Sequence, residues 1–158
     1  MFAIFPNVNS MRIVGMNTKT QRILGDVVNN HANLECLELW DTVEVDDQWK
    51  SQTVGTCPGS FEWCNPNHDV RLEKLEKLVI NGRLTSKRNQ LTRCLLGASV
   101  RLMQLHLGNI SHLSDEDVEN TILSPLGSTL VNLTLNECGG LAQPTIKSNI
   151  LQTLALTG

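Results

Sequence analysis

The stretch Leu130-Val-Asn-Leu133-Thr-Leu135 decides the fold of this 158-residue chain. Aliphatic residues occupy its first, fourth and sixth positions, and the chain contains six such copies, which begin at Val8, Leu34, Leu75, Leu102, Leu130 and Leu151. Their starts are 26, 41, 27, 28 and 21 residues apart. A period of roughly 20–29 residues is typical of repeats that carry one strand and one helix. The pattern therefore predicts a repeat architecture, with an insertion in the second repeat.

Within each copy, the later aliphatic residues alternate with other residues, as in a short β-strand that buries one face. Leu133 and Leu135 are expected in the core, whereas Thr134 between them is expected on the opposite face. A single repeat cannot cover its own apolar edge, so neighbouring repeats must stack. The sequence predicts an α/β leucine-rich-repeat solenoid, a horseshoe segment of about six repeats. Its parallel sheet is expected on the concave side, with helices and turns on the convex side.

The apolar spacing becomes helical between the strands. Val118, Ile122 and Leu126 recur every four residues, which predicts a helix with one buried stripe. Ser114 is a favourable N-cap, and the acidic residues at 115–117 complement the positive end of the helix dipole. We therefore interpret 115–117 as a helix start rather than a metal site.

The residues from Leu130 to Ile146, LVNLTLNECGGLAQPTI, resemble the cysteine-containing, ribonuclease-inhibitor-like leucine-rich repeats often found behind an F-box. In that family a Cys or Asn after the strand hydrogen-bonds the loop backbone, and Cys138 holds that position. The other repeats carry different residues there, namely Met16, Thr42, Arg83 and Ile110. The resemblance implies a substrate-receptor role in an F-box-type ubiquitin ligase, of which this chain would supply the substrate-reading half.

The domain organisation is expected to be simple. Residues 1–158 are interpreted as a single repeat domain, with a loop insertion at 46–71 in the second repeat. Natural repeat arrays end in polar capping repeats, whereas Gly158 follows a core strand position by two residues. We therefore expect a fragment of a longer array, or self-association through the uncovered ends.

Composition narrows the function classes. Charged residues make up 18% of the chain, the net charge is −3, and no run of Lys and Arg is present. This argues against nucleic-acid and anionic-membrane binding, which need clustered positive charge. No apolar run is long enough to cross a membrane, and the N-terminus lacks a signal-peptide pattern. A cytoplasmic location is expected, or an extracellular one if a signal peptide lies outside this chain.

The interleaved strand residues are the candidates for partner binding, because the aliphatic residues are committed to the core. This surface mixes charges of both signs with amides, which suits a polypeptide partner. Trp40 is either the aromatic anchor for that partner or a residue packed beneath the insertion. Glu38 and Lys77 either select the partner's charge or form a cross-strand ion pair. The predicted partner-binding residues are Arg12, Glu38, Trp40, Lys77, Asn81, Gln104, His106, Asn132 and Asn136.

The insertion at 46–71 offers a weak metal motif. Cys57, Cys64 and His68 carry ligand types that zinc prefers, but their spacing is non-standard and a fourth ligand is missing. A disulfide between Cys57 and Cys64 and a pair of free thiols are the alternatives. We predict no metal and no cofactor.

The sequence contains no recognisable catalytic motif. His106 and Cys36 could resemble a base and a nucleophile, but the predicted strand order separates them beyond proton-transfer distance. The expected function is non-catalytic protein–protein interaction through the concave sheet. An extracellular or innate-recognition ectodomain is one alternative, and a metal- or thiol-dependent enzyme centred on the insertion is another.

Overall fold

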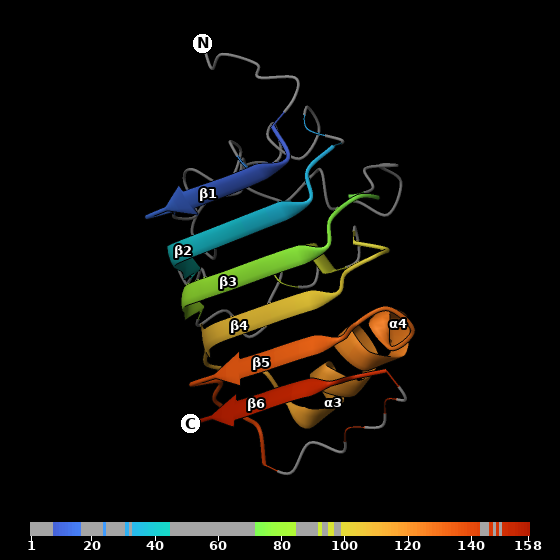
Figure 1. Cartoon of the computed structure of the whole chain (residues 1–158). Helices are drawn as coiled ribbons and strands as arrows, with labels where there is room; N and C mark the ends of the chain where they lie inside the picture. Colours follow the sequence, from blue (N-terminus) through green and yellow to red (C-terminus); the bar gives the residue numbers. More distant parts are fainter. Residues whose placement is uncertain are drawn as a thin grey trace, which may run out of the picture.

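The structure is a computed structural model. It describes residues 8–16, 24, 31, 33–44, 72–84, 92, 95–96, 99–142, 146, 148 and 150–158. Within this part of the chain, six strands form one parallel sheet in the order of the sequence (Figure 1). The strands are β1 (Ser10–Val14), β2 (Cys36–Glu44), β3 (Lys77–Leu84), β4 (Gln104–Ile110), β5 (Asn132–Asn136) and β6 (Thr153–Thr157). The predicted insertion and its candidate ligands Cys57, Cys64 and His68 lie outside the described residues.

The strands pair in the register that the repeated phrase predicts. Leu105 pairs with Leu133, and Leu133 with Leu154, so equivalent positions of successive copies form continuous rows across the sheet. At the start of the strands, the carbonyl of Glu35 accepts hydrogen bonds from the N–H groups of both Glu76 and Lys77. This arrangement recurs at every neighbouring pair, with the carbonyls of Asn9, Glu35, Glu76, Met103 and Val131 as acceptors.

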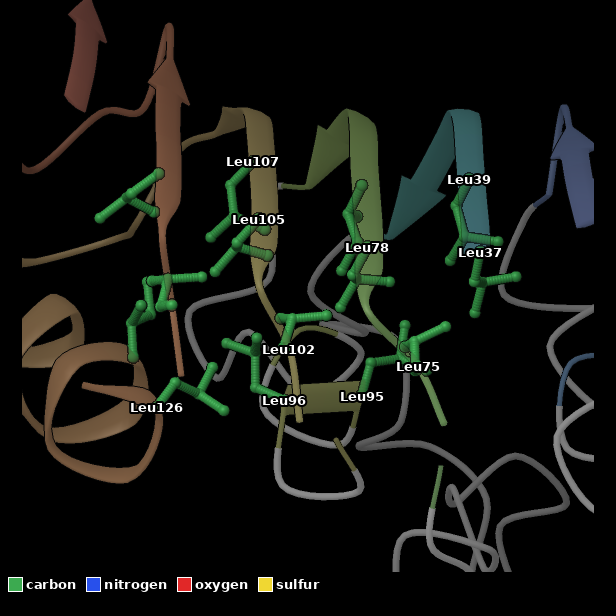
Figure 2. Close-up of a cluster of buried hydrophobic side chains, with 14 of the residues drawn as sticks. Leu37, Leu39, Leu75, Leu78, Leu95, Leu96, Leu102, Leu105, Leu107 and Leu126 are labelled. Atoms are coloured by element: carbon green, nitrogen blue, oxygen red, sulfur yellow. The ribbon is translucent and has the colours of Figure 1, made fainter. Parts of the chain in front are cut away.

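The aliphatic residues of the repeats form one core on one side of the sheet (Figure 2). The inward residues of β2 to β5 are at most 2% exposed, as the alternation predicts. Leu95 and Leu96, from the segment between β3 and β4, lie beneath the sheet beside Leu102 and are also buried. Burying one such leucine contributes about 1.5–3 kcal/mol. The core therefore explains why each copy keeps three aliphatic residues.

The described helical segment follows β4 and begins where the sequence predicts. The segment runs through α3 (Asp115–Asp117), η3 (Val118–Leu123) and α4 (Ser124–Leu126). The Ser114 hydroxyl accepts from the Asp117 amide, and the Asp117 side chain accepts from the Ser114 amide, which completes a capping box. The stripe Val118, Ile122 and Leu126 is buried, as expected. None of the described helices is long and apolar enough to span a membrane.

Several strands contain, or are directly followed by, one residue in the left-handed backbone region. This residue is Gly15 after β1, Asp41 within β2, Asn109 within β4 and Glu137 after β5, with φ values of 74°, 51°, 60° and 50°. The turn directs the next residue back into the core, where Met16, Thr42 and Ile110 are buried. β2 and β4 continue past this residue, and there the pairing of β2 with β3 and of β3 with β4 shifts in register.

The edge strand β6 differs from its neighbours in burial. Its inward residues Leu154 and Leu156 are 43% and 45% exposed, whereas Leu133 and Leu135 of β5 are at most 1% exposed. In the described residues β6 pairs with β5 only. The difference follows from having one neighbouring strand instead of two.

Candidate functional site

The sheet face opposite the leucine core carries all nine predicted partner-binding residues. We call it the polar face. Two rows of register partners cross all six strands: Ser10, Cys36, Lys77, Gln104, Asn132 and Thr153; then Arg12, Glu38, Val79, His106, Thr134 and Ala155. A third row is interrupted by the register shift between β2 and β3: Val14 and Trp40 pair on one side of it, and Asn81, Gly108, Asn136 and Thr157 pair on the other. Because the strands are parallel, each full row aligns residues that span 143 positions of the sequence.

Trp40 lies at the centre of interactions with residues of β1, β2 and β4. Its indole N–H donates to the Glu38 carboxylate at 3.2 Å. The Arg12 guanidinium carbon lies 5.1 Å from the ring centroid. The imidazole of His106 lies near the indole of Trp40, with the two ring centroids 6.3 Å apart and the ring planes inclined by 34°. The indole is therefore held in one orientation while it stays partly exposed.

Glu38 and Lys77 form the predicted cross-strand ion pair, with 2.6 Å between Lys77 Nζ and Glu38 Oε1. The pair is diagonal, since the register partner of Lys77 is Cys36. The hydrogen bond from Lys77, followed by that from Trp40, lowers the pKa of Glu38. The hydrogen bond to Glu38 raises the pKa of Lys77. Both groups are charged at neutral pH, and both oxygens of Glu38 are in use.

Trp40 and His106 meet above β3, because that strand separates β2 from β4. Val79 of β3 is only 5% exposed even though it lies on the polar face. Sequence alternation places Val79 on this surface but does not predict that larger neighbours cover it. Burial lowers the pKa of His106, and the charge of Lys77 lowers it further. The imidazole is therefore neutral at pH 7, and its buried Nε2 has no hydrogen-bond partner within the described residues.

The amides of the polar face divide into two groups. Asn81 accepts a hydrogen bond from the Asn109 side chain at 3.1 Å, and Asn136 accepts one from the Thr157 hydroxyl. Gln104 is exposed and Asn132 is partly exposed, and neither side chain forms a hydrogen bond within the described part of the chain. Among the four amides, only Gln104 and Asn132 can therefore bind a partner without breaking an internal hydrogen bond. The role of Asn109 was not predicted, although Asn tolerates the left-handed conformation that it adopts.

No protein-family model, curated protein or solved structure matches the chain. Among the described residues, no three His, Cys, Asp or Glu side chains are grouped closely enough to hold a metal ion. Cys36 and His106 lie on strands separated by β3, in agreement with the predicted strand order. What the face does present is a fixed aromatic ring, two cations and free amides.

Proposed function

We propose that the chain is a segment of a leucine-rich-repeat solenoid that binds a polypeptide partner through its polar face. Six strands in chain order, joined by the same carbonyl arrangement at each step, support the repeat interpretation. The leucine core occupies one side of the sheet. The other side carries Trp40 and Arg12, residue types that are enriched in protein interfaces.

The observation that carries this proposal is the orientation of Trp40. Tryptophan and arginine are enriched among residues that dominate binding energy. Here Glu38 and Arg12 hold the indole before any partner arrives, so little side-chain entropy remains to be lost on binding. A partly exposed ring fixed in this way supports an anchor role.

The test is affinity capture with the purified chain and with a Trp40→Ala/His106→Ala variant shown by circular dichroism to keep its fold. The matched control is Arg101→Ala/Glu119→Ala, since both side chains are exposed and lie outside the polar face. Captured proteins are identified, and their binding is reconstituted from purified components. We expect the Trp40 variant to lose them and the control to retain them. Equal binding by all three proteins refutes the proposal.

A narrower role as the substrate-recognition part of a cytoplasmic F-box-type ubiquitin ligase is proposed from the resemblance at 130–146. The Cys138 thiol lies 3.5 Å from the carbonyl oxygen of Asn136 and 3.7 Å from that of Leu107, and burial raises its pKa. Such contacts favour the loop-binding role that the family gives this cysteine. The test is whether the reconstituted partner gains ubiquitin in cells when the chain is overexpressed, and loses that response with the Trp40→Ala/His106→Ala variant. An unchanged partner rejects this role and leaves polypeptide binding standing.

A further inference from the structure

The uncommitted charge on the polar face over β1 to β3 is positive, although the whole chain has a net charge of −3. Both oxygens of Glu38 accept hydrogen bonds, from Lys77 and Trp40. Arg12 is exposed, and no carboxylate within the described residues forms an ion pair with it. The Lys77 side chain remains 42% exposed, and an ammonium group has three donors. Arg12 and Lys77 can therefore bind further acceptors, whereas Glu38 is satisfied.

Four acidic side chains are exposed near the ends of the strands. Glu35 and Glu76 are exposed immediately before β2 and β3. Asp41 is exposed immediately after Trp40, and Glu137 immediately after β5. A partner carboxylate placed beside one of these acidic side chains would meet like charge, which costs binding energy. Carboxylates are therefore favoured beside Arg12 and Lys77, over β1 to β3.

The remaining half of the polar face is uncharged. Across β4 to β6, the row that starts at Ser10 contains Gln104, Asn132 and Thr153. The row that starts at Arg12 contains His106, Thr134 and Ala155. Free amide groups such as Gln104 and Asn132 can donate to and accept from a peptide backbone. This half therefore suits uncharged residues of an extended chain.

The rows also set the length of the occupant. Adjacent strands lie about 4.8 Å apart, so six strands span roughly 24 Å. An extended peptide advances about 3.4 Å per residue, so about seven residues cover one row.

We propose that the polar face binds an extended peptide of about seven residues that crosses the strands and carries one acidic side chain near the end that lies over β1 to β3. This inference rests on the proposed function, and it specifies the partner's chemistry. The carboxylate contacts Arg12 and Lys77, an apolar neighbour packs on Trp40, and the uncharged remainder lies along Gln104 and Asn132.

The experiment uses pools of seven-residue peptides, acetylated and amidated to remove terminal charge, and measures binding by fluorescence anisotropy. One pool has a single Asp scanned through all positions, and matched pools have Asn or Lys there. We expect the Asp pool to bind best, with Asp near one end preferred over the middle. Binding should weaken as the sodium chloride concentration is raised, because salt screens the attraction between the peptide carboxylate and the partly exposed cations.

Two variants connect the preference with the site. Arg12→Gln should weaken binding of the best Asp peptide roughly tenfold and leave the matched Asn peptide almost unaffected. Arg101→Gln removes an equal charge outside the polar face and should change neither. Tighter binding of the Asn or Lys pools overturns the acidic preference and leaves the proposed function intact. No binding to any pool, combined with no partner captured by the whole chain, rejects both.

Discussion

Arg12 of β1 lies over the indole ring of Trp40 of β2, with 5.1 Å between the guanidinium carbon and the ring centroid. The two residues are not register partners, since Arg12 pairs with Glu38 and Trp40 with Val14. The contact is a diagonal cation–π interaction at the sheet surface. It joins the first strand to the residue that we propose as the anchor.

A double-mutant cycle measures this interaction. Arg12→Gln and Trp40→Leu are combined, and free energies of unfolding are obtained from urea denaturation. We expect a coupling of about 0.5–1 kcal/mol, as found for exposed cation–π pairs. Arg12→Lys keeps the charge and should retain part of the coupling. A coupling of zero would mean that the contact adds nothing to stability.

Acidification should destabilise the fold through His106. Its pKa is lowered in the folded protein, first by burial and then by Lys77, whereas the unfolded chain titrates near 6.5. As the pH falls below about 6.5, the unfolded state takes up the proton first, so the free energy of unfolding decreases until the folded pKa is passed. His106→Gln should remove this part of the difference between pH 7.5 and 5.5. The same loss of stability in the variant would assign it to other groups.

Glu137→Gly should stabilise the protein. Glu137 has φ = 50° and an exposed side chain, and a left-handed non-glycine residue costs about 1–2 kcal/mol. Part of this gain is offset by the greater freedom of glycine in the unfolded chain, which leaves an expected net gain of about 0.5–1 kcal/mol. Glu119→Gly, at an exposed position inside the helical segment, should instead cost about 1 kcal/mol. Similar changes for both variants in thermal denaturation would contradict this account.

Gly82→Ala should be among the most destabilising small substitutions. A Cβ atom at Gly82 would overlap the carbonyl oxygen of Thr42 and lie 2.5 Å from its amide nitrogen. Thr42 is backbone-paired with Gly82 and fully buried, so neither strand can move away cheaply. We expect a loss of about 3 kcal/mol in chemical denaturation. Gly158→Ala meets no atom within 4 Å and should be neutral.

Leu133→Ala and Leu154→Ala should differ although the two residues are register partners. Leu133 is fully buried, and truncating it should cost about 2–5 kcal/mol through lost burial and a cavity. Leu154 is 43% exposed, so its truncation should cost about 1 kcal/mol or less. Urea midpoints of the two variants provide the comparison. Equal losses would show that the core extends fully to β6.

The strand residues and their alignment could be predicted because the signal is local and repeated. Alternation assigns Leu133 and Leu135 to the core, and six aligned copies then fix the rows of the polar face. The start of the helix at Ser114 was also predictable, since N-cap chemistry depends on neighbouring residues. Both predictions are confirmed.

Other features depend on how side chains meet across strands, and alternation carries no such information. Asn81 is turned onto Gly108 and Asn109, so it is less available to a partner than its strand position suggests. Val79 is buried although alternation places it on the polar face, and the rings of Trp40 and His106, from the strands on either side of it, lie 6.3 Å apart. The left-handed position after the strands escaped prediction because Gly, Asp, Asn and Glu all occupy it, so no residue type marks it.

The chain-order arrangement of the sheet has a consequence for how the protein is made. Each of the strands β1 to β6 pairs only with the strands next to it in sequence, so none of them needs a partner that is encoded far downstream. When a new strand emerges during synthesis, the preceding strand with which it pairs has already been synthesised. The sheet can therefore grow vectorially from the ribosome, in steps that each close a loop of one repeat. The longest connection lies between β2 and β3, where 32 residues must be synthesised before the next strand begins.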